Sequence, residues 1–146
     1  MSNASDIVAA RIIRDNEEGF RADVYDDATG KPIQCLGQPT IGYGIRCRSW
    51  SKWVAQKILS LFLEEDEASL LLTDWYNGCD DVRRSALLEI AFNQGDSGLE
   101  NGYPNLIAAV RAKDWTRAQA ECTVEQINTK PRYARIGQIL LTGMDV

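Results

Sequence analysis

The chain has 146 residues, of which 45% are apolar and 25% charged, as in an ordinary single globular domain. No stretch approaches the roughly 20 apolar residues of a membrane span, and segment 1–18 lacks the basic and apolar regions of a secretory signal. We therefore expect neither a membrane span nor a signal peptide, and we assign residues 1–4 no structural role.

The net charge of −5 and the absence of histidine exclude several classes of function. Without histidine, a Ser-His-Asp triad, a Cys-His pair and a histidine-ligated zinc site are all impossible. The acidic balance argues against a nucleic-acid partner, which favours a basic surface. The prediction is a monomer that needs no cofactor and no metal.

Four cysteines, Cys35, Cys47, Cys79 and Cys122, are scattered without Cys-x-x-Cys spacing. This pattern favours free thiols over a metal site. A disulfide between Cys35 and Cys47, facing each other across a hairpin, is the alternative for that pair.

The first third of the chain predicts one helix followed by a small sheet. Ser5 and Asp6 form a helix-start signal, and apolar residues then recur at helical spacing, which predicts a helix to about Glu17. From Phe20 to Cys47, glycines and prolines separate short segments rich in Val, Ile, Thr and Tyr. This pattern of short strand-forming segments separated by turn residues indicates a small antiparallel sheet.

After Ser49 the pattern is helical. A long helix is predicted to end near residues 77–78, with charged residues 64–67 on its solvated side. Trp50, Trp53 and Trp75 are interpreted as core or lobe contacts. The face predicted to be buried comprises Val54, Ile58, Leu61, Ala68, Leu72 and Trp75.

Asp80 or Asp81 is predicted to cap the next helix, and residues 95–102 are predicted to form a loop. The inward-facing residues of that capped helix are expected to be Val82, Ala86, Leu87, Ile90 and Ala91. Further helices are predicted over 104–112, 114–124 and 131–141.

The fold class is therefore α+β and mainly helical, with residues 1–146 forming one domain. A small antiparallel β-lobe, over about 18–48, follows the first helix. A long helix joins it to a helical lobe that spans about 52–146 and includes the first helix. Clefts tend to form where two such lobes meet.

Two carboxylates lie on either side of that predicted junction. Glu18 follows the first helix, where the helix dipole disfavours an ionised carboxylate and suits a general acid. Asp27 belongs to the sheet side, with the hydroxyl of Thr40 available as a partner. Such a pair suits glycoside hydrolysis, although acids near a turn are more often caps or solvated groups.

The order of motifs is more specific. Glu18-Gly19 is followed by Tyr25-Asp26-Asp27 and then by Thr40-Ile41-Gly42-Tyr43-Gly44. This arrangement resembles family 24 of the glycoside hydrolases, the phage-type lysozymes, whose fold is lysozyme-like. The resemblance implies that Glu18 is the general acid, that Asp27 and Thr40 flank the attacking water, and that Gly44 contacts substrate. The spacing from Glu18 favours Asp27 for this role, and Asp26 is the alternative.

The helical lobe continues the likeness. Residues 81–87 and 91–95 resemble the family's central buried helix, which leads to a Phe-Asn-x-Gly segment on the cleft floor. Residues 131–135 resemble its closing helix, whose arginine contacts the acidic pair. The resemblance implies that Phe92, Asn93 and Arg132 bind substrate, with Arg135 as the alternative arginine. Phe92 is also expected to face the core.

The implied activity is that of a muramidase (endolysin) acting on the bond between N-acetylmuramic acid and N-acetylglucosamine, with inversion. The implied partner is the glycan strands of peptidoglycan. The enzyme would be made in the cytoplasm and reach the wall through a holin-type pore, or through a secretion system as an antibacterial effector. Ile45 stands where the family commonly has histidine. A glycan-binding module with little activity, and a lytic transglycosylase using Glu18 alone, are the alternatives.

Overall fold

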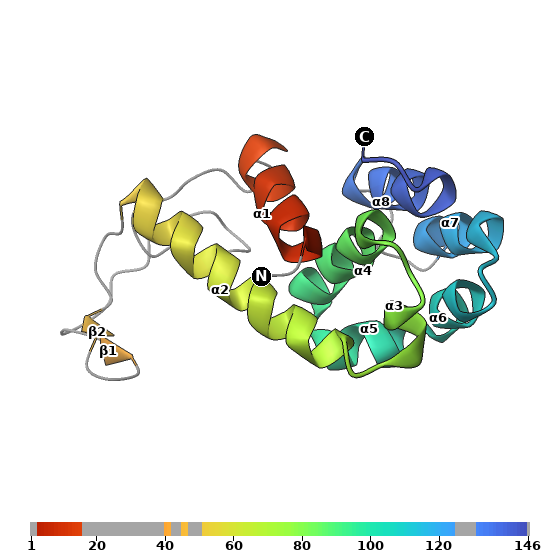
Figure 1. Cartoon of the computed structure of the whole chain (residues 1–146), viewed down its shortest axis with the longest axis horizontal. Coiled ribbons are helices and arrows are strands. Elements are labelled where there is room, and N and C mark those ends of the chain that lie inside the picture. Colours follow the sequence, from red (N-terminus) through yellow and green to blue (C-terminus); the bar gives the residue numbers. More distant parts are fainter. Residues whose placement is uncertain (1–2, 16–39, 42–44, 47–50, 125–130, 146) are drawn as a thin grey trace.

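The computed structural model describes residues 3–15, 40–41, 45–46, 51–124 and 131–145, and these are mainly helical (Figure 1). The helices are α1 (Asn3–Asp15), α2 (Lys52–Leu70), α3 (Asp74–Asn77), α4 (Asp81–Gln94), α5 (Asp96–Gly102), α6 (Pro104–Arg111), α7 (Trp115–Val124) and α8 (Pro131–Thr142). The strands are β1 (Thr40–Ile41) and β2 (Ile45–Arg46).

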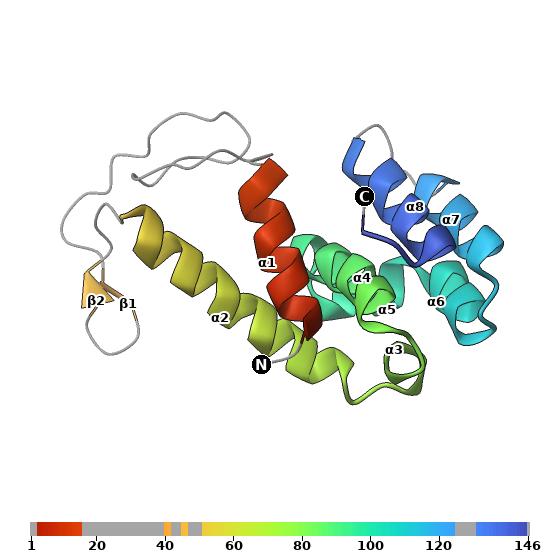
Figure 2. The ribbon, with the colours of Figure 1, turned by 45° about the horizontal axis from the view of Figure 1, so that its top comes forward.

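The two short strands pair antiparallel, with Thr40 opposite Arg46 and Ile41 opposite Ile45. They lie beyond the N-terminal end of α2, away from the helical lobe, in both views of the ribbon (Figures 1 and 2). The pair falls within the segment predicted to form a small sheet. The rest of the predicted β-lobe, including Cys35, Cys47 and Trp50, lies outside the described residues.

The first helix begins earlier than predicted. α1 starts at Asn3 rather than Ser5, and both Ala4 and Ser5 are buried. The reason is a tertiary contact: the backbone N–H of Ser5 donates to Oε2 of Glu67 on α2 at 3.2 Å. This bond occupies one of the amide groups that a helix start leaves without an intrahelical partner. Residues 3 and 4 therefore belong to the fold, and the expectation that they have no role is wrong.

The predicted long helix is two helices. α2 ends at Leu70, and the hydroxyl of Thr73 donates to the Leu70 carbonyl at 2.8 Å, closing a turn before α3 begins at Asp74. The predicted apolar face is wrong at three positions: Ala68 is exposed, and Leu61 and Leu72 are 63% and 89% exposed. The buried positions of α2 are Leu63, Glu67 and Leu70. Of the tryptophans, Trp75 is buried as predicted, whereas Trp53 is exposed.

Glu67 was predicted to lie on a solvated surface and is instead only 1% exposed. Its carboxylate accepts from the Ser5 N–H and, through Oε1, from the hydroxyl of Tyr76 at 3.2 Å. Burial, and then the neighbouring Glu67, raise the pKa of Tyr76 well above its usual range, so its hydroxyl remains a donor. A buried carboxylate is tolerated when hydrogen bonds satisfy it.

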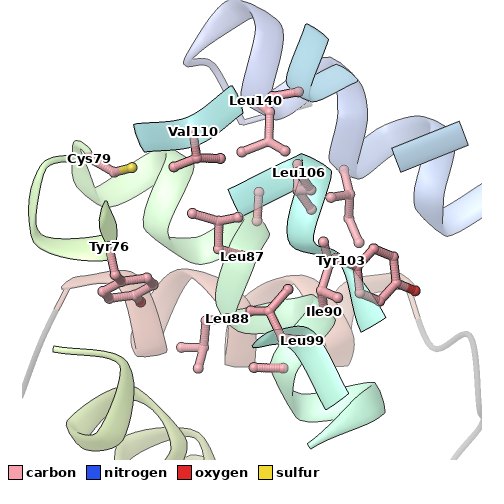
Figure 3. Packing of buried hydrophobic residues seen from close by; sticks show 14 of the residues in the cluster. Tyr76, Cys79, Leu87, Leu88, Ile90, Leu99, Tyr103, Leu106, Val110 and Leu140 are labelled. Carbon is pink, nitrogen blue, oxygen red and sulfur yellow. The ribbon is translucent and has the colours of Figure 1, made fainter. Parts of the chain in front are cut away.

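Helix α4 runs through the core. Leu87, Leu88 and Ile90 project from it among side chains of the surrounding helices (Figure 3), and all three are fully buried. Its N-terminus is capped by Asp80, whose Oδ1 accepts from the Arg83 N–H at 2.9 Å, as the sequence predicted. The predicted inward face is confirmed for Ala86 and Ala91 as well.

Arg83 ties α4 to α7 and α8. Its guanidinium donates to the Leu140 carbonyl at 2.8 Å and lies 4.3 Å from the centre of the Trp115 ring. Gly143, at φ +68°, follows α8 and lies against the Arg83 side chain. A Cβ added at this position would lie 2.7 Å from a guanidinium nitrogen. Glycine is therefore favoured at position 143, because other residues are strained at this φ and an added Cβ would displace the Arg83 guanidinium.

Residues 96–102 form helix α5, not the predicted loop. Gly95, at φ +77°, lies between α4 and α5, and Leu99 of α5 is fully buried. That burial stabilises a short helix whose sequence, rich in glycine and polar residues, has little helical propensity. Helices α6, α7 and α8 agree with their predicted ranges to within one residue at each end.

Cys79 and Cys122 are free and buried, which confirms the prediction of free thiols at these positions. Burial raises the pKa of the Cys79 thiol to about 11 and that of Cys122 to about 12. Both therefore remain protonated, and so unreactive, at neutral pH.

Asp80→Ala is expected to lower the free energy of unfolding by about 0.5–2 kcal/mol at neutral pH, because the α4 cap is lost. Burial opposes ionisation of Asp80, but hydrogen bonds from Arg83 outweigh it and hold its pKa below the usual 3.8. The cap's contribution is therefore fully present above that value and is lost as pH falls through the folded-state pKa. Urea unfolding of both proteins at pH 7 and near pH 3 measures this, with Asp81→Ala as control. If the two proteins differed in free energy of unfolding by the same amount at both pH values, the ionised Asp80 side chain would not be the stabilising cap.

Candidate active site

The predicted site residues fall into three groups. Asn93 and Phe92 lie in the last turn of α4, and Arg132 in the first turn of α8. Thr40 is placed in β1 as backbone. Glu18, Asp27 and Gly44 lie outside the described residues.

Asn93 and Arg132 are 39 residues apart in sequence and are brought into contact. The Arg132 guanidinium donates to the side-chain oxygen of Asn93. The side-chain nitrogen of Asn93 in turn donates to the backbone carbonyl of Glu89, one turn earlier on α4, at 2.7 Å. Asn93 is therefore held in one orientation at an exposed position, and its contacts within the described part of the chain use only part of its hydrogen-bonding capacity.

Phe92 does not face the core. Its side chain is 36% exposed, and the residues from 92 to 95 are all exposed where α4 emerges from the packed lobe. The expectation of a core-facing Phe92 fails because its helix ends two residues later, at Gln94. An exposed aromatic ring beside Asn93 is compatible with a contact to sugar.

Beneath Asn93 and Arg132 lies a buried charge cluster that the sequence reasoning missed. Glu89 on α4 is 1% exposed, and its Oε2 accepts from Arg11 of α1 at 2.8 Å. Its Oε1 accepts from Arg135 of α8 at 2.5 Å and lies 3.9 Å from Nε of Arg132. We call Glu89, Arg11, Arg132 and Arg135 the Glu89 cluster; it joins three helices.

Arg11 is the most deeply buried arginine of the cluster. Besides Glu89, its guanidinium donates to the Ser85 hydroxyl at 2.9 Å and to Asp145 at 2.7 Å. The segment that follows α8 thus returns to α1, and the ribbon shows the C-terminus near these helices (Figure 2). The carboxylates compensate a guanidinium that would otherwise be unpaired in the core.

A sequence signal for this cluster existed. Glu89 interrupts the apolar run 86–91, and Arg11 interrupts the apolar run of the first helix. A charged residue on the buried face of a helix requires a partner of opposite charge. Both Arg132 and Arg135 pair with Glu89, and of the two it is Arg132 that also contacts Asn93.

The sequence model of the phage lysozymes matches residues 15–132, which is most of the chain. The chain belongs to the phage lysozyme family. It is therefore a glycoside hydrolase of a family that hydrolyses peptidoglycan and acts on the cell wall. No curated protein shows significant sequence similarity to it.

The resemblance drawn from the sequence motifs is thus confirmed at the level of the family. Among the helices that the structure describes, none combines the length and apolar character needed to cross a membrane.

Asn93→Ala in this lysozyme is expected to raise KM for peptidoglycan more than it lowers kcat. The resemblance implies that Asn93 contacts sugar, and an interaction that binds substrate without taking part in the chemical step contributes to ground-state and transition-state binding alike. Because the side chain is exposed, the free energy of unfolding should fall by only about 1 kcal/mol. Reducing-end release over a range of substrate concentrations measures the two constants, with exposed Gln94→Ala as control. A fall in kcat with unchanged KM would remove Asn93 from the glycan-binding set.

Proposed function

We propose that this phage lysozyme is a muramidase that cleaves the β-1,4 bond between N-acetylmuramic acid and N-acetylglucosamine, with inversion at the anomeric carbon. The observation that carries the proposal is the extent of the family match. Residues 15–132 contain every proposed site residue: Glu18, Asp27, Thr40, Gly44, Phe92, Asn93 and Arg132. The contact between Asn93 and Arg132 supports it from the structure.

Glu18 is the proposed general acid. It follows the last described residue of α1, Asp15, by three positions. In this role its carboxyl group protonates the glycosidic oxygen as the bond to the anomeric carbon breaks, which requires a pKa raised toward neutrality.

Asp27 and Thr40 are the proposed partners of the attacking water. Asp27 accepts a proton from a water on the opposite face of the sugar, and the Thr40 hydroxyl provides a second hydrogen bond to hold that water. A water-activating base gains from such a hydroxyl, whereas a nucleophilic carboxylate has no use for it in the first step.

The proposed glycan-binding residues are Gly44, Phe92, Asn93 and Arg132. Asn93 supplies a planar amide for sugar hydroxyl or acetamido groups, and Phe92 an exposed apolar ring beside it. The substrate is the glycan strand of peptidoglycan, which the enzyme reaches through a pore or a secretion system.

Glu18→Gln is expected to abolish hydrolysis while leaving the fold intact or slightly more stable. The amide keeps the shape of the side chain and loses the proton that the leaving group needs. Turbidity loss of peptidoglycan suspensions and release of reducing ends measure activity, and Glu17→Gln is the neighbouring control. General acid catalysis contributes about 10²–10⁴-fold, so activity within about tenfold of the unaltered enzyme would reassign the acid.

Binding and product analysis of the unaltered chain separate the alternatives. Retention of peptidoglycan by the unaltered chain without turbidity loss would favour a glycan-binding module. Anhydromuramic ends, detected by mass spectrometry of the products, would show a lytic transglycosylase that uses Glu18 alone.

The freshly released reducing end is expected to be the α-anomer, because water attacks a β-linked glycan from the opposite face. Proton NMR during the first minutes of the reaction, before mutarotation, distinguishes the two anomers. Initial appearance of the β-anomer would mean retention, and Asp27 would then be a nucleophile. Inverting pairs of carboxyl groups stand about 6.5–9.5 Å apart and retaining pairs about 5–5.5 Å, which gives an independent geometric test.

A further inference from the structure

Glu89 connects Asn93 and Arg132, two residues of the proposed glycan site, through a closed circuit of contacts. Its carboxylate pairs with Arg132 and Arg135, Arg132 donates to the Asn93 side chain, and Asn93 donates back to the Glu89 carbonyl. Helix α4 carries two members of the circuit and α8 carries the arginines, so the circuit spans the junction of these helices.

A carboxylate is suited to this position because it offers acceptors on two sides. Oε2 faces Arg11 of α1, while Oε1 faces Arg135 and Arg132 of α8. Glutamine at this position would turn its NH₂ group toward guanidinium N–H groups on one of these sides, placing donor against donor. Either α1 or α8 would then lose its anchor.

We propose that Glu89 is a positioning residue of the enzyme: it orients Arg132, and through it Asn93, for productive binding of the glycan. The inference rests on the proposed muramidase function and extends it to a group buried below the glycan-binding residues. Glu89 itself is 1% exposed and acts through Arg132 rather than on the substrate.

The test compares Glu89→Gln with Glu67→Gln. Both residues are 1% exposed carboxylates, but Glu67 accepts hydrogen bonds from Ser5 and Tyr76, on helices α1 and α3. Both variants are expected to lower the melting temperature. With uncross-linked glycan strands, below both melting temperatures, Glu89→Gln should lower kcat/KM by about tenfold to a hundredfold, the scale for misplacement of about 1 Å. Glu67→Gln should leave kcat/KM within about twofold.

A double-mutant cycle with Arg132→Ala separates positioning from general destabilisation. If Glu89 acts through Arg132, adding Glu89→Gln to Arg132→Ala should change kcat/KM by less than about twofold. Adding Glu67→Gln provides the matched comparison. If Glu89→Gln does not fold, Glu89→Asp, which keeps the charge and is shorter by one methylene, takes its place in the cycle.

Equal loss of kcat/KM in Glu89→Gln and Glu67→Gln, or multiplicative effects of the Glu89 and Arg132 substitutions, would overturn the inference and leave the proposed function standing. Absence of hydrolysis by the unaltered chain would instead overturn the proposed function, and this inference with it.

Discussion

The helical lobe depends on one buried carboxylate. Glu89 lies among the apolar side chains of α4, where an unpaired charge would cost several kcal/mol, and it is stabilised by guanidinium groups that arrive from α1 and α8. Because these guanidinium groups are themselves largely buried, the carboxylate and the guanidinium groups each need the other as a partner. The arrangement of the three helices is therefore specified by charge as well as by apolar packing.

A second buried carboxylate fixes the other end of α1. Glu67 of α2 accepts from the first turn of α1 at Ser5, and Glu89 pairs with Arg11 two turns later. The helix is thus held at both ends by carboxylates from two different helices, which restricts rotation about its axis and sliding along it.

The proposed chemistry separates into groups that react and groups that hold the substrate. Glu18, Asp27 and Thr40 belong to the first set, and Asn93 and Arg132 to the second. The second set is held by hydrogen bonds at the meeting point of α4 and α8, and productive geometry within a fraction of an ångström requires such support. Membership of the phage lysozyme family gives both sets a common substrate, peptidoglycan.

Local sequence patterns and the order of motifs were enough to predict several features of the fold and the family of this protein. The Asp80 cap, the apolar face of α4, the ranges of α6 to α8 and the family all follow from neighbouring residues or short spacings, which the sequence displays directly. Tertiary structure alone decided the break between α2 and α3, helix α5, the early start of α1 and the burial of Glu67. It also decided the Glu89 cluster, whose members lie 46 and 78 residues apart along the chain. The physical reason is that a charged residue appears solvated in sequence until a distant partner is brought beside it, and only the folded chain supplies that partner.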